Sequence, residues 1–233
     1  MSRLWSFPSI LVAALVIAGP LGAFAGLLSP WLGFRLFLLG GAVALVSAIA
    51  LAGASAIAAL RGSPWRRRAV RAALFPVAVT LCLFLLQAGG GQPTHPFNDV
   101  TTNLEDPPGF TSGPAAGKTY PEEFVELQRQ AYPDLAPLRT ERPPSEVFAR
   151  ALETARRMPS WQIVSEDPAE GLIQAVSTSR IFRFNDDLAI RIRSDSDGSV
   201  VDVRSRSRVG QSDLGANAAR IRAFFAAFEA PPA

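Results

Sequence analysis

Acidic residues are absent from the first 98 positions of this chain, and three long runs there carry no charge at all. The runs cover residues 4–28, 36–60 and 72–88 and are 25, 25 and 17 residues long. A bilayer core needs about 20 apolar residues per helix, with a range of about 17–25. We therefore expect three transmembrane helices in residues 1–88, and the composition argues against a purely soluble protein, a disordered chain or a disulfide scaffold.

Arginine placement predicts the orientation of these helices. Seven arginines lie in the first 88 residues, of which five fall between Arg61 and Arg71 and one is Arg3. Positively charged loops stay in the cytoplasm. The sequence therefore predicts a multi-pass protein of the bacterial inner membrane, with a cytoplasmic N-terminus and a periplasmic C-terminal domain. The tripeptide Ala23-Phe24-Ala25 leaves an alternative open, in which the first run is a cleaved signal peptide.

The second apolar run carries small residues at a spacing of roughly four, which suits close helix–helix contact. They are Gly40, Gly41, Ala44, Ser47, Ala48, Ala52, Gly53 and Ala56. This face predicts close approach of another helix, as in assembly with a membrane-protein partner, and the alternative is that the spacing only reflects an alanine-rich composition.

The C-terminal 145 residues carry 20 acidic and 16 basic groups, a net charge of −4. The overall charge of +3 therefore comes from the membrane region and does not indicate a nucleic-acid partner. Cys82 is the only cysteine, so no disulfide can form within the chain.

Residues 89–119 are rich in Gly, Pro, Thr and Asn, which predicts an extended tether. Residues 120–233 follow as an exported domain of about 110 residues. Prolines and acidic residues predict helices that begin near Tyr120 and Pro143. Alternation of apolar and polar residues predicts strands over 161–165, 172–178, 187–193 and 199–207, and a last helix over 213–228. The expected fold class is α+β, a small antiparallel sheet with helices packed on one face.

Two stretches of this domain, TSRIFRFNDD at 178–187 and VDVRSRSRVGQSDLGANAARI at 201–221, resemble signatures of the bacterial domain of unknown function 1499 family. The upstream segments NDVTT at 98–102, DPP at 106–108 and QRQAYPD at 128–134 complete the pattern. The resemblance covers about residues 97–228, and some members are similar in having N-terminal membrane helices. It implies membership and no activity, because the family has no established reaction or assigned catalytic residue.

The sequence contains few residues or motifs typical of catalytic or cofactor sites. The only histidine, His95, lies in the predicted tether, where a base is poorly held against a nucleophile. A zinc site needs several Cys or His ligands, and no phosphate-binding loop or dinucleotide motif is present. We predict no metal and no cofactor, and the turn Asp195-Ser196-Asp197-Gly198 predicts a hairpin more than a calcium loop.

Arginines follow two neighbouring strands on the side opposite their apolar residues. This parity predicts a row of guanidinium groups on one surface, either paired with carboxylates across the strands or able to bind carboxylate, phosphate or sulfate. The candidate ligand-binding residues are Arg191, Arg193, Arg204, Arg206 and Arg208, with hydroxyl donors from Ser177 and Ser179. The carboxylates available for pairing are Asp186, Asp202 and Asp213.

The sequence thus favours a non-catalytic binding module of the cell envelope for an anionic ligand or partner, such as a lipid head group. One alternative is an envelope hydrolase that uses Asp186, Asp187 or Asp213. A second alternative is a structural partner in a membrane complex. Adjacent residues on a strand point to opposite faces, so Asp186 and Asp187 are not expected to act together.

Overall fold

A computed structural model describes residues 2–63, 66–89 and 95–231 of the chain. The chain divides into two compact units. The first contains residues 1–91 and 180–183, and the second contains residues 92–179 and 184–233. Each unit is described by itself.

The first unit is built from three helices, α1 (Ser2–Phe24), α2 (Pro30–Leu60) and α3 (Arg66–Gly89). They overlap the three uncharged runs, and α1 ends at Phe24, four residues before the end of the first run. The side-chain oxygen of Ser29 accepts a hydrogen bond from the backbone N–H of Leu32, which caps the start of α2. Helices α1 and α2 approach closely at Gly19 and Gly33, where added side chains would meet the opposite backbone.

Helix α2 is long and apolar enough to cross a membrane, judged by length and composition. The apolar parts described for the other two helices, Ser9–Phe24 of α1 and Ala69–Cys82 of α3, are shorter. A signal sequence, or the core helix of a soluble protein, has the same properties as α2. The structure therefore places a helix over each predicted span, and the membrane-crossing assignment rests on α2.

Part of the small-residue face of α2 packs inside the chain. Gly40, Ala44 and Ala48 are buried, and a side chain at Gly40 would collide with Val16 of α1. Gly53 has open space around it. The close approach of another helix that this face predicts is therefore seen in its N-terminal half, where the neighbour is α1.

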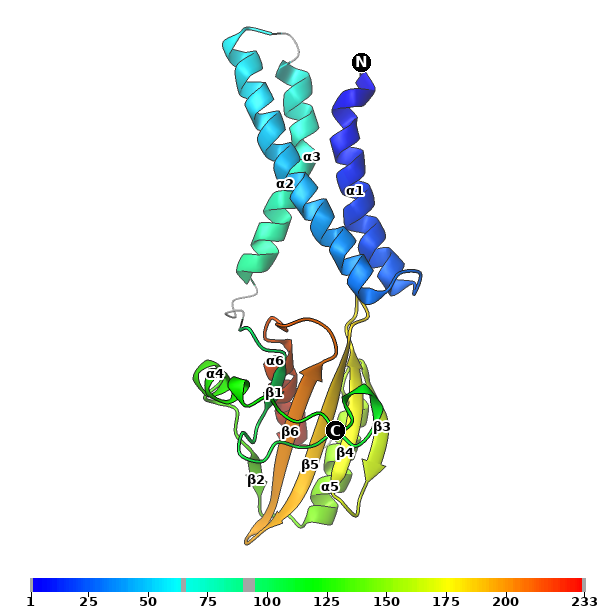
Figure 1. Ribbon diagram of the computed structural model, residues 1–233, viewed down its shortest axis with the longest axis vertical. Helices are drawn as coiled ribbons and strands as arrows, with labels where there is room; N and C mark the ends of the chain where they lie inside the picture. Colours follow the sequence, from blue (N-terminus) through cyan, green and yellow to red (C-terminus); the bar gives the residue numbers. More distant parts are fainter. Residues whose placement is uncertain (1, 64–65, 90–94, 232–233) are drawn as a thin grey trace. The chain divides into compact units, whose positions relative to one another are not determined.

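The second unit contains a six-stranded antiparallel sheet (Figure 1). Its long strands are β3 (Trp161–Asp167), β4 (Leu172–Thr178), β5 (Asn185–Asp195) and β6 (Gly198–Ser207). Two short strands, β1 (Asp99–Thr101) and β2 (Leu138–Thr140), pair one after the other with the free edge of β6. The sheet order is β1-β6-β5-β4-β3.

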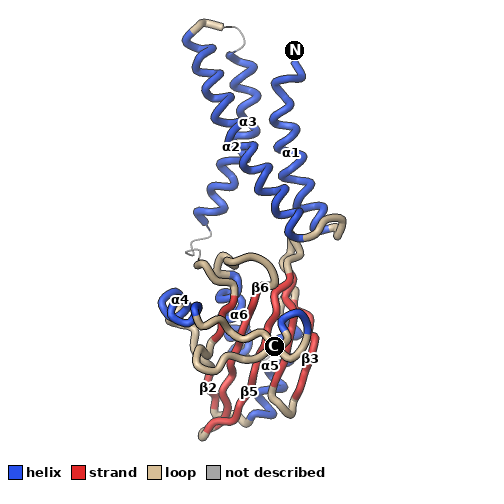
Figure 2. The backbone as a smooth tube through the Cα atoms, in the orientation of Figure 1, coloured by secondary structure: helices blue, strands red, loops and turns tan. Residues whose placement is uncertain are grey.

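Helices α5 (Pro144–Arg157) and α6 (Ala216–Glu229) cover one face of this sheet, and α4 (Glu123–Ala131) lies beside the β1 edge (Figure 2). The core between helices and sheet is formed by buried apolar side chains, among them Val147, Ile190, Val203 and Phe224. The expected α+β class, with helices on one face of an antiparallel sheet, is confirmed.

The segment predicted as a tether, residues 89–119, is largely part of the fold. Residues 90–94 lie outside the described residues. Strand β1 then joins the sheet, and residues 102–120, here called the covering segment, pass over the sheet face opposite α5 and α6 (Figure 1). Phe110 and Ala115 of this segment pack on Ala189 of β5, and the segment includes the short 3-10 helix η1 (Gly113–Ala115).

The sequence does not reveal this packing, because the covering segment lacks helical or strand periodicity. Its backbone N–H and C=O groups form hydrogen bonds with side chains and with single residues of the sheet instead. Thr102 donates its N–H to the carbonyl of Val203, and the N–H groups of Thr111 and Ser112 both donate to Gln174 Oε1 at 2.9 and 3.2 Å.

Candidate functional site

The second face of the sheet carries the predicted row of arginines. Ile190 pairs with Val203 toward the helices, while Arg191 pairs with Asp202 on the opposite side. Directly paired residues of an antiparallel ladder share a face. The arginines of β5 and β6 therefore lie on the side opposite the apolar residues, as predicted. We call this surface the arginine face, and define it by Asp187, Arg191, Arg193, Asp202, Arg204 and Arg206 of β5 and β6 with Asp99 of β1.

Asp99 and Arg204 form a buried ion pair near the middle of the arginine face. The guanidinium donates from Nε to Oδ1 at 2.9 Å and from Nη2 to Oδ2 at 2.8 Å. Arg206 approaches the same carboxylate with its Nε, 3.2 Å from Oδ2. The Arg204 side chain is 1 % exposed and that of Asp99 is 0 % exposed, so solvent does not screen this pair.

The covering segment closes over Arg204. Its Nη1 donates to the carbonyl oxygens of Pro108 and Lys118, both at 3.2 Å. Its Cζ lies 4.9 Å from the ring centre of Phe110 and 5.6 Å from that of Tyr120, which are cation–π distances. Arg204 therefore holds the covering segment on the sheet, and its guanidinium is not presented to a ligand.

Gln128 of α4 links this cluster to the β1 edge. Its Oε1 accepts hydrogen bonds from the N–H of Thr101 at 2.9 Å and from the hydroxyl of Tyr120 at 3.0 Å. Its Nε2 donates to the Thr101 carbonyl at 2.6 Å. The side-chain amide of Gln128 thus bonds both backbone groups of Thr101, as a neighbouring strand would do on the open edge of β1.

Burial dominates the electrostatics of the cluster. It raises the pKa of Asp99 above the ordinary carboxyl value, and the hydrogen bonds and charge of Arg204 offset part of that rise. Burial also raises the pKa of the Tyr120 hydroxyl, to which the nearby Asp99 adds. Tyr120 is therefore neutral at physiological pH and acts as a hydrogen-bond donor.

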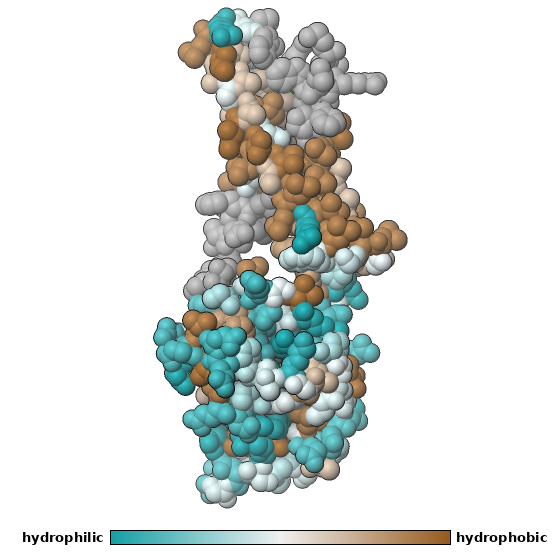
Figure 3. Space-filling view, in the orientation of Figure 1, coloured by the Kyte–Doolittle hydropathy of each residue, from teal (hydrophilic) through white to brown (hydrophobic). Residues whose placement is uncertain are grey.

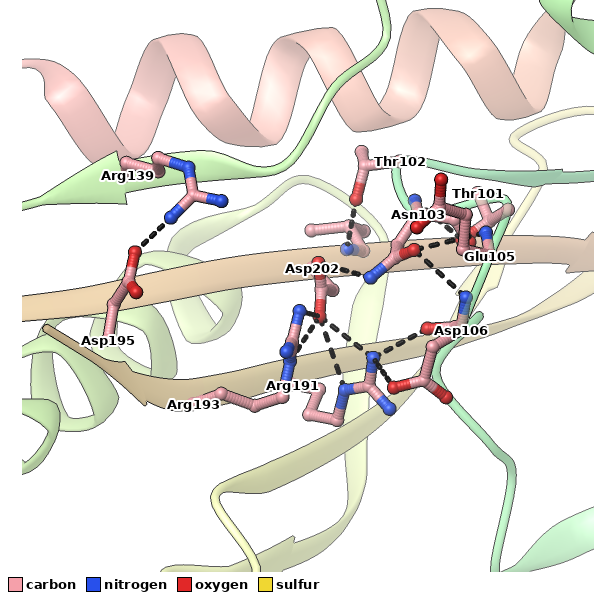
Figure 4. A network of polar contacts seen from close by, with 11 residues as sticks. Thr101, Thr102, Asn103, Glu105, Asp106, Arg139, Arg191, Arg193, Asp195 and Asp202 are labelled. Atoms are coloured by element: carbon pink, nitrogen blue, oxygen red, sulfur yellow. Dashed lines mark hydrogen bonds and ion pairs between the residues drawn. The ribbon is translucent and has the colours of Figure 1, made fainter.

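Asp202 is a second centre of the arginine face (Figure 4). Its side chain is 0 % exposed, and its Oδ2 accepts from Arg191 Nη2 at 2.9 Å and from Arg193 Nε at 2.8 Å. Asn103 donates to its Oδ1 at 3.4 Å, and Arg191 also contacts Asp106 Oδ2 at 3.0 Å. One buried carboxylate therefore orients two guanidinium groups, and the hydrogen bond to Asp202 raises the pKa of Arg193.

Asn103 and Arg193, which both contact Asp202, also line an open hollow of about 550 Å³. Its wall is formed by residues 102–106, by residues 135–137, and by three arginines from three different elements. Arg193 comes from β5, Arg139 from β2 and Arg129 from the last turn of α4. We call it the arginine hollow. Two of its arginines were missed from the sequence, because Arg129 and Arg139 lie far from the β5–β6 hairpin along the chain.

The arginines of the hollow differ in how they are held. Arg139 pairs with Asp195, and Arg129 pairs with Glu126 at 2.6 Å, and in both pairs the arginine side chain is more than half exposed. Arg193 is 41 % exposed at its outer side while Asp202 holds it from within. The hollow also carries the carboxylates of Glu105 and Asp106 on its wall.

The remaining predicted arginines lie elsewhere on the face. Arg206 is 24 % exposed and contacts Asp99, while Arg208 donates to both oxygens of Asp187 at 2.6 to 3.0 Å. The structure therefore brings Arg191 and Arg193 together and separates them from Arg204, Arg206 and Arg208. Pairing with carboxylates, the alternative left open from the sequence, is what the structure shows for all five.

The two predicted hydroxyl donors do not join the arginine face. Ser177 pairs with Asp186 in the ladder and therefore lies on the helix-covered face. Ser179 lies beyond the end of β4, where its Oγ accepts the N–H of Phe184 at 2.9 Å.

Asp186 and Asp187 lie on opposite faces, as expected for neighbours on a strand. Asp186 faces the helices, where Arg220 of α6 donates to it at 2.6 Å. Burial raises the pKa of Asp186, and the charge of Arg220 offsets part of that rise. Asp213 accepts the N–H of Asn217 at 2.6 Å and so caps the first turn of α6.

His95 packs by its ring against Phe97 and Tyr132, with ring centres 5.5 and 5.2 Å apart. Within residues 2–63, 66–89 and 95–231, no three His, Cys, Asp or Glu side chains are grouped so as to hold a metal ion. The turn at Asp195–Gly198 joins β5 to β6, as the hairpin interpretation expects.

The model of a family described as "Protein of unknown function (DUF1499)" matches residues 99–228, from the start of β1 to the last turn of α6. No curated protein matches the sequence. The match covers the whole sheet, the covering segment and the arginine hollow.

Proposed function

The chain belongs to the DUF1499 family, and from that premise we propose that its folded domain is a non-catalytic binding module. The module takes a carboxylate or phosphate group of its ligand in the arginine hollow. The observation that carries the proposal is the state of Arg193, which is fixed by a buried carboxylate on one side and half-exposed in the hollow on the other.

Preorganisation is the physical basis of this assignment. The bond to Asp202 orients the guanidinium of Arg193 before a ligand arrives, so less side-chain entropy is lost on binding. Arg193 contacts Asp202 through Nε and Nη2, which leaves further N–H groups of its planar fork for a second anion. Bidentate contact with carboxylate or phosphate is the chemistry that this fork favours.

The other two arginines supply exchangeable contacts. Exposed ion pairs such as Arg139–Asp195 and Arg129–Glu126 contribute only about 0–1 kcal/mol. A ligand anion can therefore replace Asp195 or Glu126 at small cost. Glu105 and Asp106 at the wall favour a ligand that also carries a hydrogen-bond donor or a positive group.

We further propose that the helical unit anchors the domain in a membrane as a multi-pass assembly. Large apolar side chains of α2 are exposed, among them Leu38, Leu45, Val46 and Ile49, and Figure 3 shows hydrophobic residues gathered over this unit. Exposed apolar surface of this extent suits contact with lipid. The arginines of residues 61–71 support a cytoplasmic location for the α2–α3 connection and an extracytoplasmic location for the domain.

The hydrolase hypothesis is less well supported by the carboxylates named for it. Asp187 accepts three short contacts from Arg208, and Asp213 caps α6. Asp186 has a raised pKa, and it lies beneath α6 against Arg220. Each of the three carboxylates therefore already has a structural hydrogen-bond partner.

Native mass spectrometry of the full-length protein tests the binding function. The detergent-solubilised chain is incubated with a lipid and metabolite extract of the host envelope, and retained ligands are identified by mass. We expect an acidic ligand on the wild type, loss of that ligand in the Arg139→Gln/Arg193→Gln variant, and retention in Arg222→Gln. Arg222 is the matched control because it forms a half-exposed pair with Asp134 outside the hollow. A wild-type spectrum without ligand, or equal retention by both variants, contradicts the proposal.

A further inference from the structure

The helical unit contains an open groove of about 750 Å³ between the end of α2 and the start of α3. One side of the groove is formed by the last turn of α2 and the residues that follow it, and the other side by the first turns of α3. The two helices pack against each other within this unit (Figure 1). The groove is therefore built by the helical unit alone.

The α2 side of the groove has a fixed backbone shape. Ser63 donates its N–H to the carbonyl of Ala58 at 2.9 Å, and Gly62 donates its N–H to the carbonyl of Ala59 at 3.2 Å. This pair of bonds is the Schellman closure of a helix, and Gly62 has the left-handed φ, 61°, that the closure requires. The carbonyl groups of Ala58 and Ala59 thus have partners, and Ser63 is held at the groove.

Two arginines contribute to the α3 side of the groove. Arg67 and Arg71 are four residues apart on α3, so their side chains project from the same face, about one helical turn apart. Both arginines are exposed. Two guanidinium groups at this spacing can bind the oxygens of one phosphate together.

The helical unit has no acidic residue that could neutralise these arginines. The unit consists of residues 1–91 and 180–183, and this part of the sequence contains no Asp or Glu. On the arginine face of the folded domain, in contrast, each arginine is paired with an aspartate. The counter-ion of Arg67 and Arg71 therefore comes from outside the helical unit.

The face of α3 that carries the two arginines becomes apolar further along the helix. Val70 lies between the arginines in sequence and is 44 % exposed, and Leu74 is 63 % exposed. Positions 67, 70, 71 and 74 share one face at the helical period. Leu74 follows Arg67 at a distance of about 10 Å along the helix axis, from a rise of 1.5 Å per residue. Charge followed by exposed apolar surface matches a phospholipid, in which a phosphate is linked to acyl chains.

We infer that the groove binds the phosphate of an anionic phospholipid. Arg67 and Arg71 bind the phosphate, Ser63 donates its hydroxyl to the head group, and the acyl chains lie along Val70 and Leu74. Basic pockets between transmembrane helices on the cytoplasmic side bind lipid head groups by the same chemistry. The inference rests on the membrane anchoring proposed above, in which the α2–α3 connection lies on the cytoplasmic side. It concerns a site separate from the arginine hollow.

The test uses the full-length chain in nanodiscs that contain equal amounts of phosphatidylglycerol and phosphatidylcholine with the same acyl chains. Native mass spectrometry after release from the nanodisc counts the lipids of each class that the protein retains. The charge variant is Arg67→Gln/Arg71→Gln. Its matched control is Arg35→Gln/Arg61→Gln, which removes the same charge from two exposed arginines that do not line the groove.

A second variant fills the groove and keeps every arginine. Ala59 is an exposed residue of the groove, so Ala59→Phe places a ring where the head group would lie. Its control is Ala52→Phe, at an exposed position of α2 that does not line the groove. Soluble glycerol 3-phosphate, added as a competitor, distinguishes a lipid from a free phosphate ester.

We expect the wild type to retain phosphatidylglycerol in preference to phosphatidylcholine. Each arginine near an anionic surface is worth about a fivefold change in binding, so Arg67→Gln/Arg71→Gln should lower the retained ratio of the two lipids about 25-fold. Its control should lower the ratio no more than about fivefold, through Arg61. Ala59→Phe should lower the ratio as well. Glycerol 3-phosphate and Ala52→Phe should leave it unchanged, as should Arg139→Gln/Arg193→Gln in the arginine hollow.

The contrary outcomes separate the groove from the functions proposed above. A wild-type ratio in Arg67→Gln/Arg71→Gln, or equal losses in this variant and its control, overturns the groove assignment alone. Loss of lipid in Arg139→Gln/Arg193→Gln with retention in Arg67→Gln/Arg71→Gln overturns it in favour of the hollow. Displacement of the lipid by glycerol 3-phosphate overturns the lipid as the source of the phosphate. A chain that does not enter the nanodiscs overturns the membrane anchoring and the groove assignment with it.

Discussion

Asp99 and Arg204 lie on neighbouring strands at opposite ends of the domain sequence, and both side chains are buried in one ion pair. The pair joins the edge strand β1 to β6, and Arg204 then holds two carbonyl groups of the covering segment. Arg204, which the sequence suggested as a ligand-binding residue, is thus a structural residue that holds β1 and the covering segment on β6.

Arg204→Met should destabilise the protein by about 3–5 kcal/mol, because it leaves the carboxylate of Asp99 buried with only Arg206 as a partner. Urea unfolding of the full-length chain in detergent, followed by near-ultraviolet circular dichroism, measures the change. Arg222→Met is the control, since its half-exposed pair should contribute less than about 1 kcal/mol. Equal losses in the two variants would show that the Asp99–Arg204 pair is not the stabilising element.

The raised pKa of Asp186 predicts a pH dependence of stability. Its folded pKa lies above the ordinary value of 3.8, so the native state keeps a proton where the unfolded state has lost it. The stabilisation is complete below 3.8 and is lost as the pH rises through the raised value. Asp186→Asn should flatten this decline while retaining an acceptor for Arg220. Asp197→Asn, in the exposed turn, should leave the wild-type pH profile unchanged, and a profile unaltered by Asp186→Asn would refute the assignment.

Gln174 should control the opening of the covering segment. Its Oε1 accepts the backbone N–H groups of Thr111 and Ser112, and its Nε2 donates to the Thr111 hydroxyl at 2.6 Å. Gln174→Leu removes these partners, and we expect faster hydrogen exchange confined to the covering segment. Gln162→Leu, on the exposed side of the edge strand β3, should leave that exchange unchanged. Uniform acceleration over the whole domain would instead indicate global destabilisation.

Gly171 should be intolerant of a side chain. It turns the chain from β3 into β4 with a φ of 63°, and an added Cβ would collide with the carbonyl oxygen of Ile192. Gly171→Ala should lower the free energy of unfolding by at least about 1 kcal/mol, from backbone strain and the collision together. Gly109→Ala, where nothing lies within 4 Å of the added atom, should change it by no more than about 0.5 kcal/mol. Similar values for both would contradict the packing at Gly171.

The sequence predicted the elements that have strong periodicity. Strand β4 has the predicted bounds, and β5 and β6 differ by one or two residues, because alternation fixes which side chains are buried. Strands β1 and β2 were missed because three residues are too short to show alternation. The covering segment was taken for a tether because its partners, such as Gln174 and Val203, are distant in sequence.

For the candidate site, the sequence could predict which face of the sheet carries the arginines, but not which residues from distant segments join them. Strand parity placed Arg191, Arg193 and Arg204 on one surface, but it could not show that Asp99 would neutralise Arg204 from a segment 105 residues away. Nor could it show that Arg139 would come beside Arg193 through β2. Pairing between distant segments depends on tertiary packing, which local patterns do not encode.

The arginine hollow is tested most directly as the ligand site by native mass spectrometry of the wild type and of Arg193→Gln at equal concentration. The measured quantity is the ratio of ligand-bound to free protein. Arg191 still pairs with Asp202 in this variant, so the fold should persist. Charge-assisted hydrogen bonds contribute about 1.5–3 kcal/mol, which predicts a fall in the ratio of about tenfold or more for Arg193→Gln. An unchanged ratio in Arg193→Gln would contradict the assignment of the arginine hollow as the ligand site.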